Sequence, residues 1–430
     1  MAGAEMGQPS LVRAVGLLSL TAMAVNGIIG AGIFVLPAVV ARLAGPAGWF
    51  AYVAAGSAIF LVVLCFAEAG SRFETSGGPF VYARAAFGGF TGFLAGWMFL
   101  LSRLAGFAAV SNGLAGYAGH FWPPAAAGLG RLSTITLLFA LLTFVNTVGL
   151  RQSVWVMNLL TLAKLLPLAV FVIFGLIALD PHRYAVSAAF QVADLREAAL
   201  VLVFAFGGFE YASIPGEEVV NPRRNLPIAL IVATAVVSVC YLLIHLVAQG
   251  ALPDLAASEA PLAAAAKVLF GPAGAGLMTL GAILSMAGTN SSSMLAASRM
   301  VYALGKEGPL PAILARVHPR YRTPWIAVWA FALLSWVFAI SGTFEYLAVI
   351  SSLGRLFFYG ATCAAVLVLR RNPPDGRRYF AVPGGPVVPL LAIAMCIWLL
   401  TGVPASQVKA GMAALLIGAL LYGVSRLPTA

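Results

Sequence analysis

The chain has 430 residues, of which 61% are hydrophobic and only 9% are charged, and its mean hydropathy is +0.98. An ordinary soluble domain has about 25% charged residues, so this composition excludes a soluble globular protein and indicates a polytopic membrane protein. The four cysteines all fall in apolar segments without a C-x-x-C pair, which argues against a disulfide framework.

Twelve apolar segments are long enough, at about 20 residues each, to cross a bilayer as helices. The first ten residues contain neither a basic region nor a small-residue cleavage site. We therefore expect the first segment to be retained rather than removed as a signal peptide. The expected segments are 15–41, 47–70, 87–118, 132–150, 155–179, 196–216, 228–249, 273–302, 324–341, 345–369, 385–402 and 407–425.

The net charge of +11 follows from the position of the basic residues along this map. With the N-terminus in the cytoplasm, most of the 25 Lys and Arg residues lie in cytoplasmic connections. Cytoplasmic loops collect Lys and Arg, so we expect a multi-pass protein of the plasma (inner) membrane with both termini in the cytoplasm. Topology explains the charge, and no nucleic-acid partner is predicted. The cytoplasmic set is Arg13, Arg72, Arg84, Arg151, Arg223, Arg224, Lys306, Arg316, Arg320, Arg322, Arg370, Arg371, Arg377, Arg378 and Arg426; the opposite set is Arg42, Arg131, Arg183, Arg196, Lys267 and Lys409.

Three glycines, Gly27, Gly30 and Gly32, interrupt the first segment. Each costs up to about 1 kcal/mol relative to Ala in a helix interior, and each allows the backbone to approach a ligand closely. In lipid, an opened backbone persists only where it is buried in protein or lines a cavity. We interpret the stretch as a membrane helix broken for a purpose; close helix packing through small residues is the alternative interpretation.

The sixth segment has a similar interruption, in which the pair Gly207-Gly208 is followed by the ionisable Glu210. Two glycine-interrupted segments at corresponding places in two halves indicate a transporter binding site. Because the two segments are five apart, the second half is inverted in the membrane. We expect one all-α transmembrane domain over 1–430, with five-helix inverted repeats at 10–180 and 195–370 and two additional helices at 384–426.

Four stretches carry a family resemblance. Gly27–Pro37 reads G-I-I-G-A-G-I-F-V-L-P, Ser76–Arg84 reads S-G-G-P-F-V-Y-A-R, and Glu217–Pro227 has the pattern E-E-x-x-N-P-x-R-x-x-P. The fourth runs from Ser298-Arg299 to Gly308-Pro309-Leu310-Pro311. Together they resemble the amino acid–polyamine–organocation (APC) superfamily in the family's order. The resemblance implies the LeuT-type fold with broken helices one and six, and a secondary active amino acid transporter that works by alternating access.

The chemistry of the breaks suits an amino acid. A broken helix offers free N–H groups at the start of one half and free C=O groups at the end of the other, and these suit a carboxylate and an ammonium respectively. By the resemblance, the amides of Gly30, Ala31 and Gly32 would bind the carboxylate. Carbonyls near Ile28 and Gly207 would receive the ammonium.

Four further residues are expected to border the substrate. Phe204 aligns with the family's aromatic gate, although an ordinary packing role is the alternative, and Gly207 leaves room for a bulky neutral substrate. Asn290 and Ser291 belong to a polar run in the middle of the eighth segment. A polar run at this depth faces protein or water, so we expect both to line the substrate path, with interhelical hydrogen bonding as the alternative.

Two ionisable residues are candidates for coupling or gating. An ammonium in mid-membrane costs at least about 2.5 kcal/mol on insertion scales, so Lys164 is a functional candidate; snorkelling to the surface is the alternative. By the resemblance, Lys164 would bond carbonyls near Gly27–Gly30 in the place of sodium, which makes transport sodium-independent. Glu210 is expected either to carry a proton or sense pH or to form a fixed hydrogen bond.

Two arginines bear on the choice of substrate. Arg103 lies in the middle of the third segment, near the position at which cationic-substrate members of the family have an acid. It disfavours cationic substrates, and an anionic side chain could pair with it bidentately. Alternatively, Arg103 and Arg355 pair with Glu210 or with carbonyls. Glu68 is expected at the inner gate or in a salt bridge.

Other function classes lack their motifs. The sequence has no P-loop for direct use of ATP, and neither H-E-x-x-H nor G-x-S-x-G for a membrane enzyme. We expect no enzyme activity, cofactor or metal, and the expected partners are a small-molecule amino acid and the lipid bilayer. The predicted function is transport of a neutral or acidic amino acid by exchange or proton symport. A transporter-like amino acid sensor and a transporter of another small organic amine are the alternatives.

Overall fold

The computed structural model describes residues 15–73, 75, 77–148, 154–178, 181–184, 191–214, 219–306, 310–321, 323–371 and 379–425, with the backbone alone for 154–163, 178 and 181. Within these ranges the secondary structure is helical, with one isolated β-bridge between Val15 and Val219. Parts of the sequence motifs and of the charge map lie outside the described residues, namely Ser76, Glu217, Glu218, Gly308, Pro309, Arg13, Arg151, Arg322, Arg377, Arg378 and Arg426.

The α-helices follow the expected apolar segments closely. Two differences occur. The connection that contains Tyr82 and Arg84 forms a short helix of its own. The eighth segment begins about a dozen residues earlier than expected, because the helical turns before and after Gly271 are joined by a bend at this residue, which has a positive φ of 73°. The helices are α1 (Leu17–Ile28), α2 (Ala31–Ala44), α3 (Gly48–Arg72), α4 (Pro79–Phe87), α5 (Gly89–Ala118), α6 (Gly128–Val148), α7 (Val154–Gly175), α8 (Val192–Phe206), α9 (Pro222–Ala251), α10 (Pro261–Lys306), α11 (Trp325–Ser341), α12 (Phe344–Leu369), α13 (Val387–Leu400) and α14 (Ala405–Val424).

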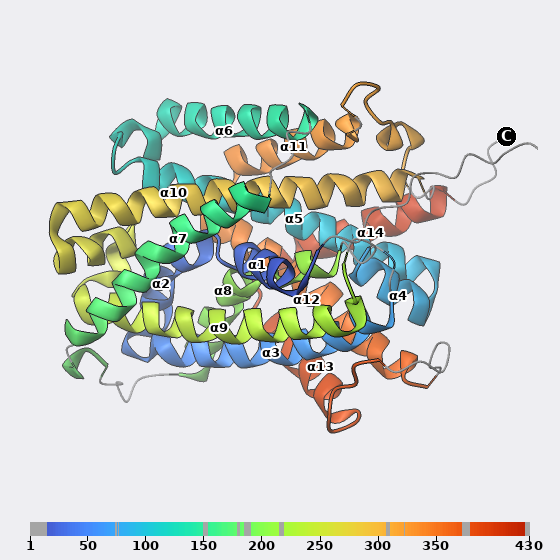
Figure 1. The fold of residues 1–430 in the computed structure, drawn as a ribbon, viewed down its shortest axis with the longest axis horizontal. Coiled ribbons are helices and arrows are strands. Elements are labelled where there is room, and N and C mark those ends of the chain that lie inside the picture. Colours follow the sequence, from blue (N-terminus) through green and yellow to red (C-terminus); the bar gives the residue numbers. More distant parts are fainter. Residues whose placement is uncertain are drawn as a thin grey trace, which may run out of the picture.

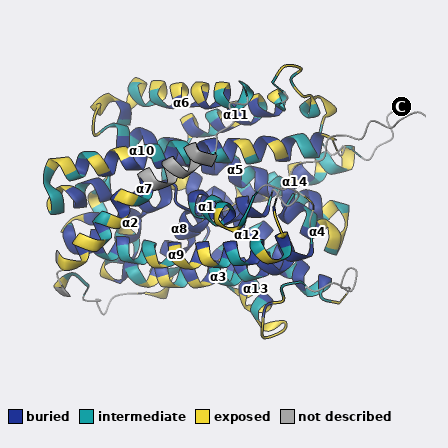
Figure 2. Ribbon diagram, viewed as in Figure 1, coloured by how far each residue is buried: buried dark blue, intermediate teal, exposed yellow. Residues whose placement is uncertain are grey.

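The outer surface of the helix bundle is apolar. Seven helical stretches of the described chain are long and apolar enough to cross a membrane, and α1, α11 and α13 are shorter apolar helices. The outermost helices expose leucines, for example Leu137 and Leu141 on α6 and Leu420 on α14. Figure 2 shows exposed positions repeated along α6. Apolar side chains on the outside and polar ones inside are the arrangement that lipid favours.

The short helices α1 and α8 lie at the centre of the molecule (Figure 1). The long helices α3 and α9 pack against each other on one side of them, and α5 and α10 pack together on the other. Helix α12 contacts α3, α5 and α8, so it closes the bundle around the centre. The burial pattern agrees, because the residues at the centre are buried (Figure 2).

Both interrupted segments are broken where their glycines lie. Helix α1 ends at Ile28 and α2 begins at Ala31, with Gly30 in an extended conformation between them (φ −122°, ψ −140°). Helix α8 ends at Phe206, and after Gly208, with φ at +124°, the chain continues as the 3₁₀ turn η5 (Phe209–Ser213). A φ of this sign is rarely adopted by residues with a side chain.

The glycines also let the two breaks touch. A Cβ on Gly208 would lie 2.1 Å from the carbonyl oxygen of Gly27, and a Cβ on Gly32 would lie 2.5 Å from the Cα of Ala205. The backbones therefore meet without intervening side chains. Close packing, the alternative interpretation of the glycine spacing, is thus present together with the opening of the helix, and it brings the two open ends to one place.

Candidate functional site

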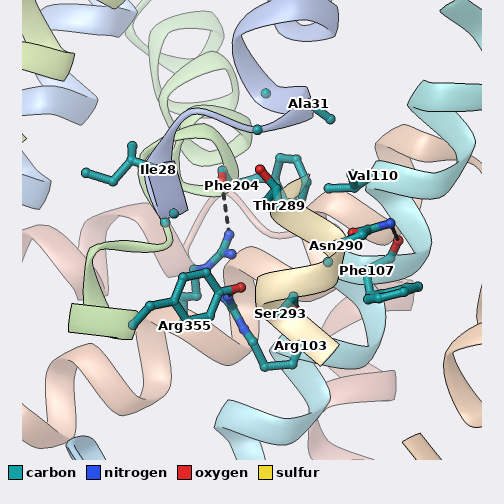
Figure 3. Close-up of a pocket in the computed structure, with 16 residues that line it drawn as sticks. Ile28, Ala31, Arg103, Phe107, Val110, Phe204, Thr289, Asn290, Ser293 and Arg355 are labelled. Atoms are coloured by element: carbon teal, nitrogen blue, oxygen red, sulfur yellow. Dashed lines mark hydrogen bonds between the residues drawn. The ribbon is translucent and has the colours of Figure 1, made fainter. Parts of the chain in front are cut away.

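A small buried cavity lies where the two breaks meet α5, α10 and α12 (Figure 3). Its free volume of about 20 Å³ is enough for roughly one water molecule. An amino acid is larger than this, so binding one requires some of the lining side chains to move. The lining residues are Gly27, Ile28, Gly30, Ala31, Gly32, Arg103, Gly106, Phe107, Val110, Phe204, Gly207, Tyr211, Thr289, Asn290, Ser293 and Arg355.

The start of α2 supplies the donor side of this cavity. Gly30 is the N-cap, and no side chain caps the helix. The first amides of a helix have no partner within the helix, and they carry partial positive charge. Gly30, Ala31 and Gly32 all line the cavity, as their expected role requires.

Lys164 of α7 binds the backbone carbonyls at the first helix break. Its ammonium is buried and donates to the carbonyl oxygens of Asn26 (3.1 Å) and Ile29 (2.9 Å). The expected contact with this stretch of backbone is present, and the snorkelling alternative is wrong. Ser285 and Thr289 of α10 also donate to the Ile29 carbonyl, at 3.1 and 3.3 Å.

Tyr241 of α9 connects the two breaks, and sequence reasoning missed it. Its hydroxyl lies 2.9 Å from the carbonyl oxygen of Ile28 and 3.3 Å from that of Ala205. A single tyrosine in an apolar segment gave no signal of this role. The Ile28 carbonyl, which we expected to receive a substrate ammonium, is therefore already engaged.

Arg355 of α12 occupies the end of α8. Its Nη1 donates to the carbonyl oxygen of Phe204 at 3.0 Å (Figure 3), and its guanidinium also faces the Phe204 ring at 5.4 Å. A Cβ added to Gly207 would lie 2.2 Å from this guanidinium. The expectation that Gly207 leaves room for a bulky substrate is wrong in this conformation, because α12 packs against α8 and the arginine side chain fills that space.

Glu210 is fully buried and is held by fixed partners. Its carboxylate accepts hydrogen bonds from the backbone N–H of Gly208 (2.8 Å), the hydroxyl of Tyr359 (3.1 Å) and Nη2 of Arg103 (3.1 Å). Arg355 Nε lies 3.5 Å from the same carboxylate. The two arginines therefore pair with Glu210, as one of the sequence hypotheses held, while a role for Glu210 in proton transfer stays a prediction. We call Glu210, Arg103 and Arg355 the Glu210 cluster.

Arg103 lines the cavity, but both terminal nitrogens of its guanidinium already donate hydrogen bonds within the protein. Nη1 donates to the hydroxyl of Tyr211, and Nη2 donates to Glu210 and to Ser102 Oγ at 3.2 Å. The side chain is only 2% exposed. An anionic substrate thus finds no free pair of Arg103 donors in this conformation.

The polar run of α10 contributes two kinds of residues. Asn290 lines the cavity, and its Nδ2 donates to Ser111 Oγ (2.9 Å) and to the Phe107 carbonyl (3.3 Å). Within the described part of the chain, its buried Oδ1 has no hydrogen-bond partner, so it remains available as an acceptor. Ser291 is buried but does not line the cavity, whereas Thr289 and Ser293 do.

A second, larger cavity adjoins the first beyond Phe204. This cavity, which we call the vestibule, has a volume of about 630 Å³ and is lined by residues that include Val35, Gly113 and Phe344. The rings of Phe204 and Phe344 meet edge to face at 5.6 Å. Since Phe204 lines the small cavity and Phe344 lines the vestibule, this aromatic pair lies at the boundary between them. Phe344 is a further candidate gate residue that its sequence context did not indicate.

The opposite end of α3 and α12 is tied by charges. Glu68 accepts from Arg72 Nη2 (2.7 Å), Arg370 Nε (2.7 Å) and the backbone N–H of Val382 (2.9 Å). Arg72 also donates to the Leu369 carbonyl at 2.8 Å. The expectation of a salt bridge at Glu68 is confirmed. We call Glu68, Arg72 and Arg370 the Glu68 cluster.

In the described part of the chain, no group of three or more His, Cys, Asp or Glu side chains is placed to hold a metal ion. The polar atoms of the cavity are instead backbone amides, hydroxyls, one carboxamide and guanidiniums. This donor set suits a small organic anion or zwitterion.

Comparison with known proteins gives a consistent result. The model of a family described as amino acid permease matches residues 15–422. A branched-chain amino acid permease and a methylthioribose transporter, both of Bacillus subtilis (strain 168), are each 29% identical, with 97% of this chain and 94% of each relative covered. A serine/threonine exchanger of the same organism is 30% identical over 89% of both chains.

Proposed function

Because the chain belongs to the amino acid permease family of the APC superfamily and is a membrane transporter rather than an enzyme, we propose that it is a secondary active transporter working by alternating access. The proposed substrate is a neutral or acidic amino acid, moved without sodium, by exchange or by symport with protons. The observation that carries this proposal is the cavity onto which the amide end of α2 and the carbonyl end of α8 both open.

The proposed fold is the twelve-helix arrangement of two inverted five-helix repeats followed by two helices. Its support is the position of the breaks in the first and sixth apolar segments and their direct backbone contact. We place the repeats at 10–180 and 195–370 and the additional helices at 384–426. From the distribution of Lys and Arg, we place the protein in the plasma (inner) membrane with both termini in the cytoplasm.

With this orientation, the vestibule opens to the outside. Helix α12 begins at the vestibule with Phe344 and ends beside the Glu68 cluster at Leu369. The Glu68 cluster therefore lies on the cytoplasmic side, where it ties α3 to the end of α12, while the Phe204–Phe344 pair lies between the cavity and the vestibule. This arrangement is that of a transporter closed to the cytoplasm and covered by a thin outer gate.

Uptake of a panel of labelled amino acids into proteoliposomes tests the transport proposal. We expect uptake that depends on internal amino acid or on a proton gradient, and that is unchanged when external sodium is replaced by choline. Binding without any uptake would contradict transport and favour a sensor. Because one relative is named as a methylthioribose transporter, the panel includes small amines and sugars as well.

Lys164 is the proposed reason for sodium independence. Its ammonium donates to the carbonyls of Asn26 and Ile29 at the first break, where a bound cation would hold the backbone open. We expect Lys164→Ala to abolish uptake, because two backbone carbonyls lose their buried cationic partner. Lys409→Ala, on α14, is the matched control. Full uptake by Lys164→Ala would contradict this role.

A further inference from the structure

The guanidinium of Arg355 occupies the place at which a substrate ammonium is expected. It donates to the Phe204 carbonyl at 3.0 Å and covers the face of Gly207. These groups form the carbonyl end of α8, whose partial negative charge favours a cation. Since about 20 Å³ of space remains, a substrate ammonium reaches this end of the helix only when Arg355 moves away.

We propose that Arg355 is a tethered cation that fills the place of the substrate ammonium and selects amino acids with a carboxylate side chain. This inference rests on the proposed function and narrows its substrate class to acidic amino acids. Arg355, rather than Arg103, is assigned the role of reading the substrate side chain.

The charges of the cluster give the reason. Two guanidiniums, those of Arg103 and Arg355, share the single carboxylate of Glu210, and these side chains are 2%, 4% and 0% exposed. The site therefore holds one excess positive charge away from water. A substrate with net negative charge balances it, whereas a neutral amino acid leaves it uncompensated and a cationic one adds to it.

The displaced guanidinium also needs a partner. In this conformation, Arg355 Nη1 bonds Phe204, and Nε makes no hydrogen bond within the described chain, lying 3.5 Å from Glu210. Once a substrate ammonium takes the Phe204 carbonyl, Arg355 loses that hydrogen bond and still has to share the Glu210 carboxylate with Arg103. A buried guanidinium that loses a hydrogen-bond partner is destabilised, and a side-chain carboxylate is the partner that matches its fork bidentately.

The position of Arg355 also links selection to the outer gate. Its guanidinium lies 5.4 Å from the ring of Phe204, and that ring contacts Phe344. When Arg355 turns toward a substrate, Phe204 loses this neighbour. Binding of the matching side chain is thus coupled to a change at the aromatic pair that covers the cavity.

The first experiment compares matched ligands on the wild-type protein in proteoliposomes. Uptake of labelled glutamate is competed with unlabelled glutamate, glutamine and glutarate, which differ by one carboxylate or by the ammonium. We expect glutamine and glutarate each to compete at least about tenfold less well than glutamate. Equal or better competition by glutamine contradicts selection of acidic side chains, and equal competition by glutarate contradicts displacement of Arg355 by an ammonium.

The second experiment assigns the preference to Arg355. We expect Arg355→Gln to reduce the glutamate-to-glutamine preference to about one, because it removes the excess charge, and Arg355→Lys to leave an intermediate preference without a bidentate fork. Arg196→Gln is the control, since Arg196 is a peripheral α8 residue that donates to Thr401 at 3.3 Å. If Arg355→Gln keeps the wild-type preference, the inference is wrong.

Different results would contradict the selection of acidic amino acids and the proposed transport function. Transport of neutral amino acids with no uptake of acidic ones would overturn the inference and leave the amino acid transporter intact. Absence of uptake for every amino acid would overturn the proposed function. Ligand-induced thermal stabilisation of the purified variants provides the same comparison by binding, so a variant with low transport activity still reports its preference.

Discussion

The Glu68 and Glu210 clusters have the same composition and opposite surroundings. Each has one buried carboxylate between two arginines that come from different segments of the chain. In the Glu68 cluster, Arg370 is 20% exposed and also donates to carbonyls of the α12–α13 loop, including that of Val382 at 3.3 Å. In the Glu210 cluster, neither arginine is more than 4% exposed.

The difference in solvent access explains what each cluster is suited to do. Water and loop carbonyls solvate the excess charge of the Glu68 cluster, so it is complete as a structural tie between α3 and α12. The arginines of the Glu210 cluster are no more than 4% exposed, so its excess charge is poorly solvated, and low dielectric strengthens its attraction for an anion. One carboxylate and two guanidiniums therefore suit a structural tie at one end of the bundle and, by our proposal, the binding of an anion at its centre.

The largest effect is expected from Glu210→Gln. Both guanidiniums of its cluster lose their counter-charge in a place that water does not reach, and breaking a buried ion pair in this way costs about 3–5 kcal/mol. We expect a much lower melting temperature for the purified protein in detergent. Glu345→Gln, which breaks an exposed pair with Arg42, is the control, and equal melting temperatures for the two variants would contradict a stabilising role for the buried Glu210 carboxylate.

A smaller effect is expected from Glu68→Gln. Arg72 loses a buried partner but keeps the Leu369 carbonyl and the ring of Tyr379, which lies 3.8 Å from its guanidinium. Arg370 turns to water. The loss corresponds to charged hydrogen bonds, about 1.5–3 kcal/mol, and thermal denaturation measures it. A loss larger than that of Glu210→Gln would reverse the comparison.

The smallest effect is expected from Arg370→Gln. This substitution removes the solvated excess charge and leaves Glu68 with Arg72 and the N–H of Val382. Because Arg370 is 20% exposed, water and salt screen part of its attraction to Glu68, so we expect a smaller decrease in melting temperature than for Glu68→Gln, and one that shrinks at high ionic strength. A large decrease independent of salt would mean that Arg370 is a buried structural charge.

Much of the site could be predicted from local sequence, because helix breaks depend on neighbouring residues. The glycines at positions 27, 30 and 32 and the pair at 207–208 determine where the backbone opens, and a lysine in an apolar segment requires polar partners wherever it lies. For that reason the breaks followed from the chain alone, whereas the contact of Lys164 with the first of them was what the family resemblance implied. The positions of Tyr241, Phe344 and the Arg355 side chain did not.

What the sequence by itself determined is the membrane class, the breaks and the set of buried charges. The tertiary structure decided how those charges are shared. Arg355 and Phe204 are 151 residues apart, and only the packing of α12 against α8 brings a guanidinium onto the carbonyl end that a free ammonium was expected to occupy. The propensity of a segment to form or break a helix depends on a few neighbouring residues. The partner of a long side chain depends instead on which helices pack together and on how they are aligned along their axes.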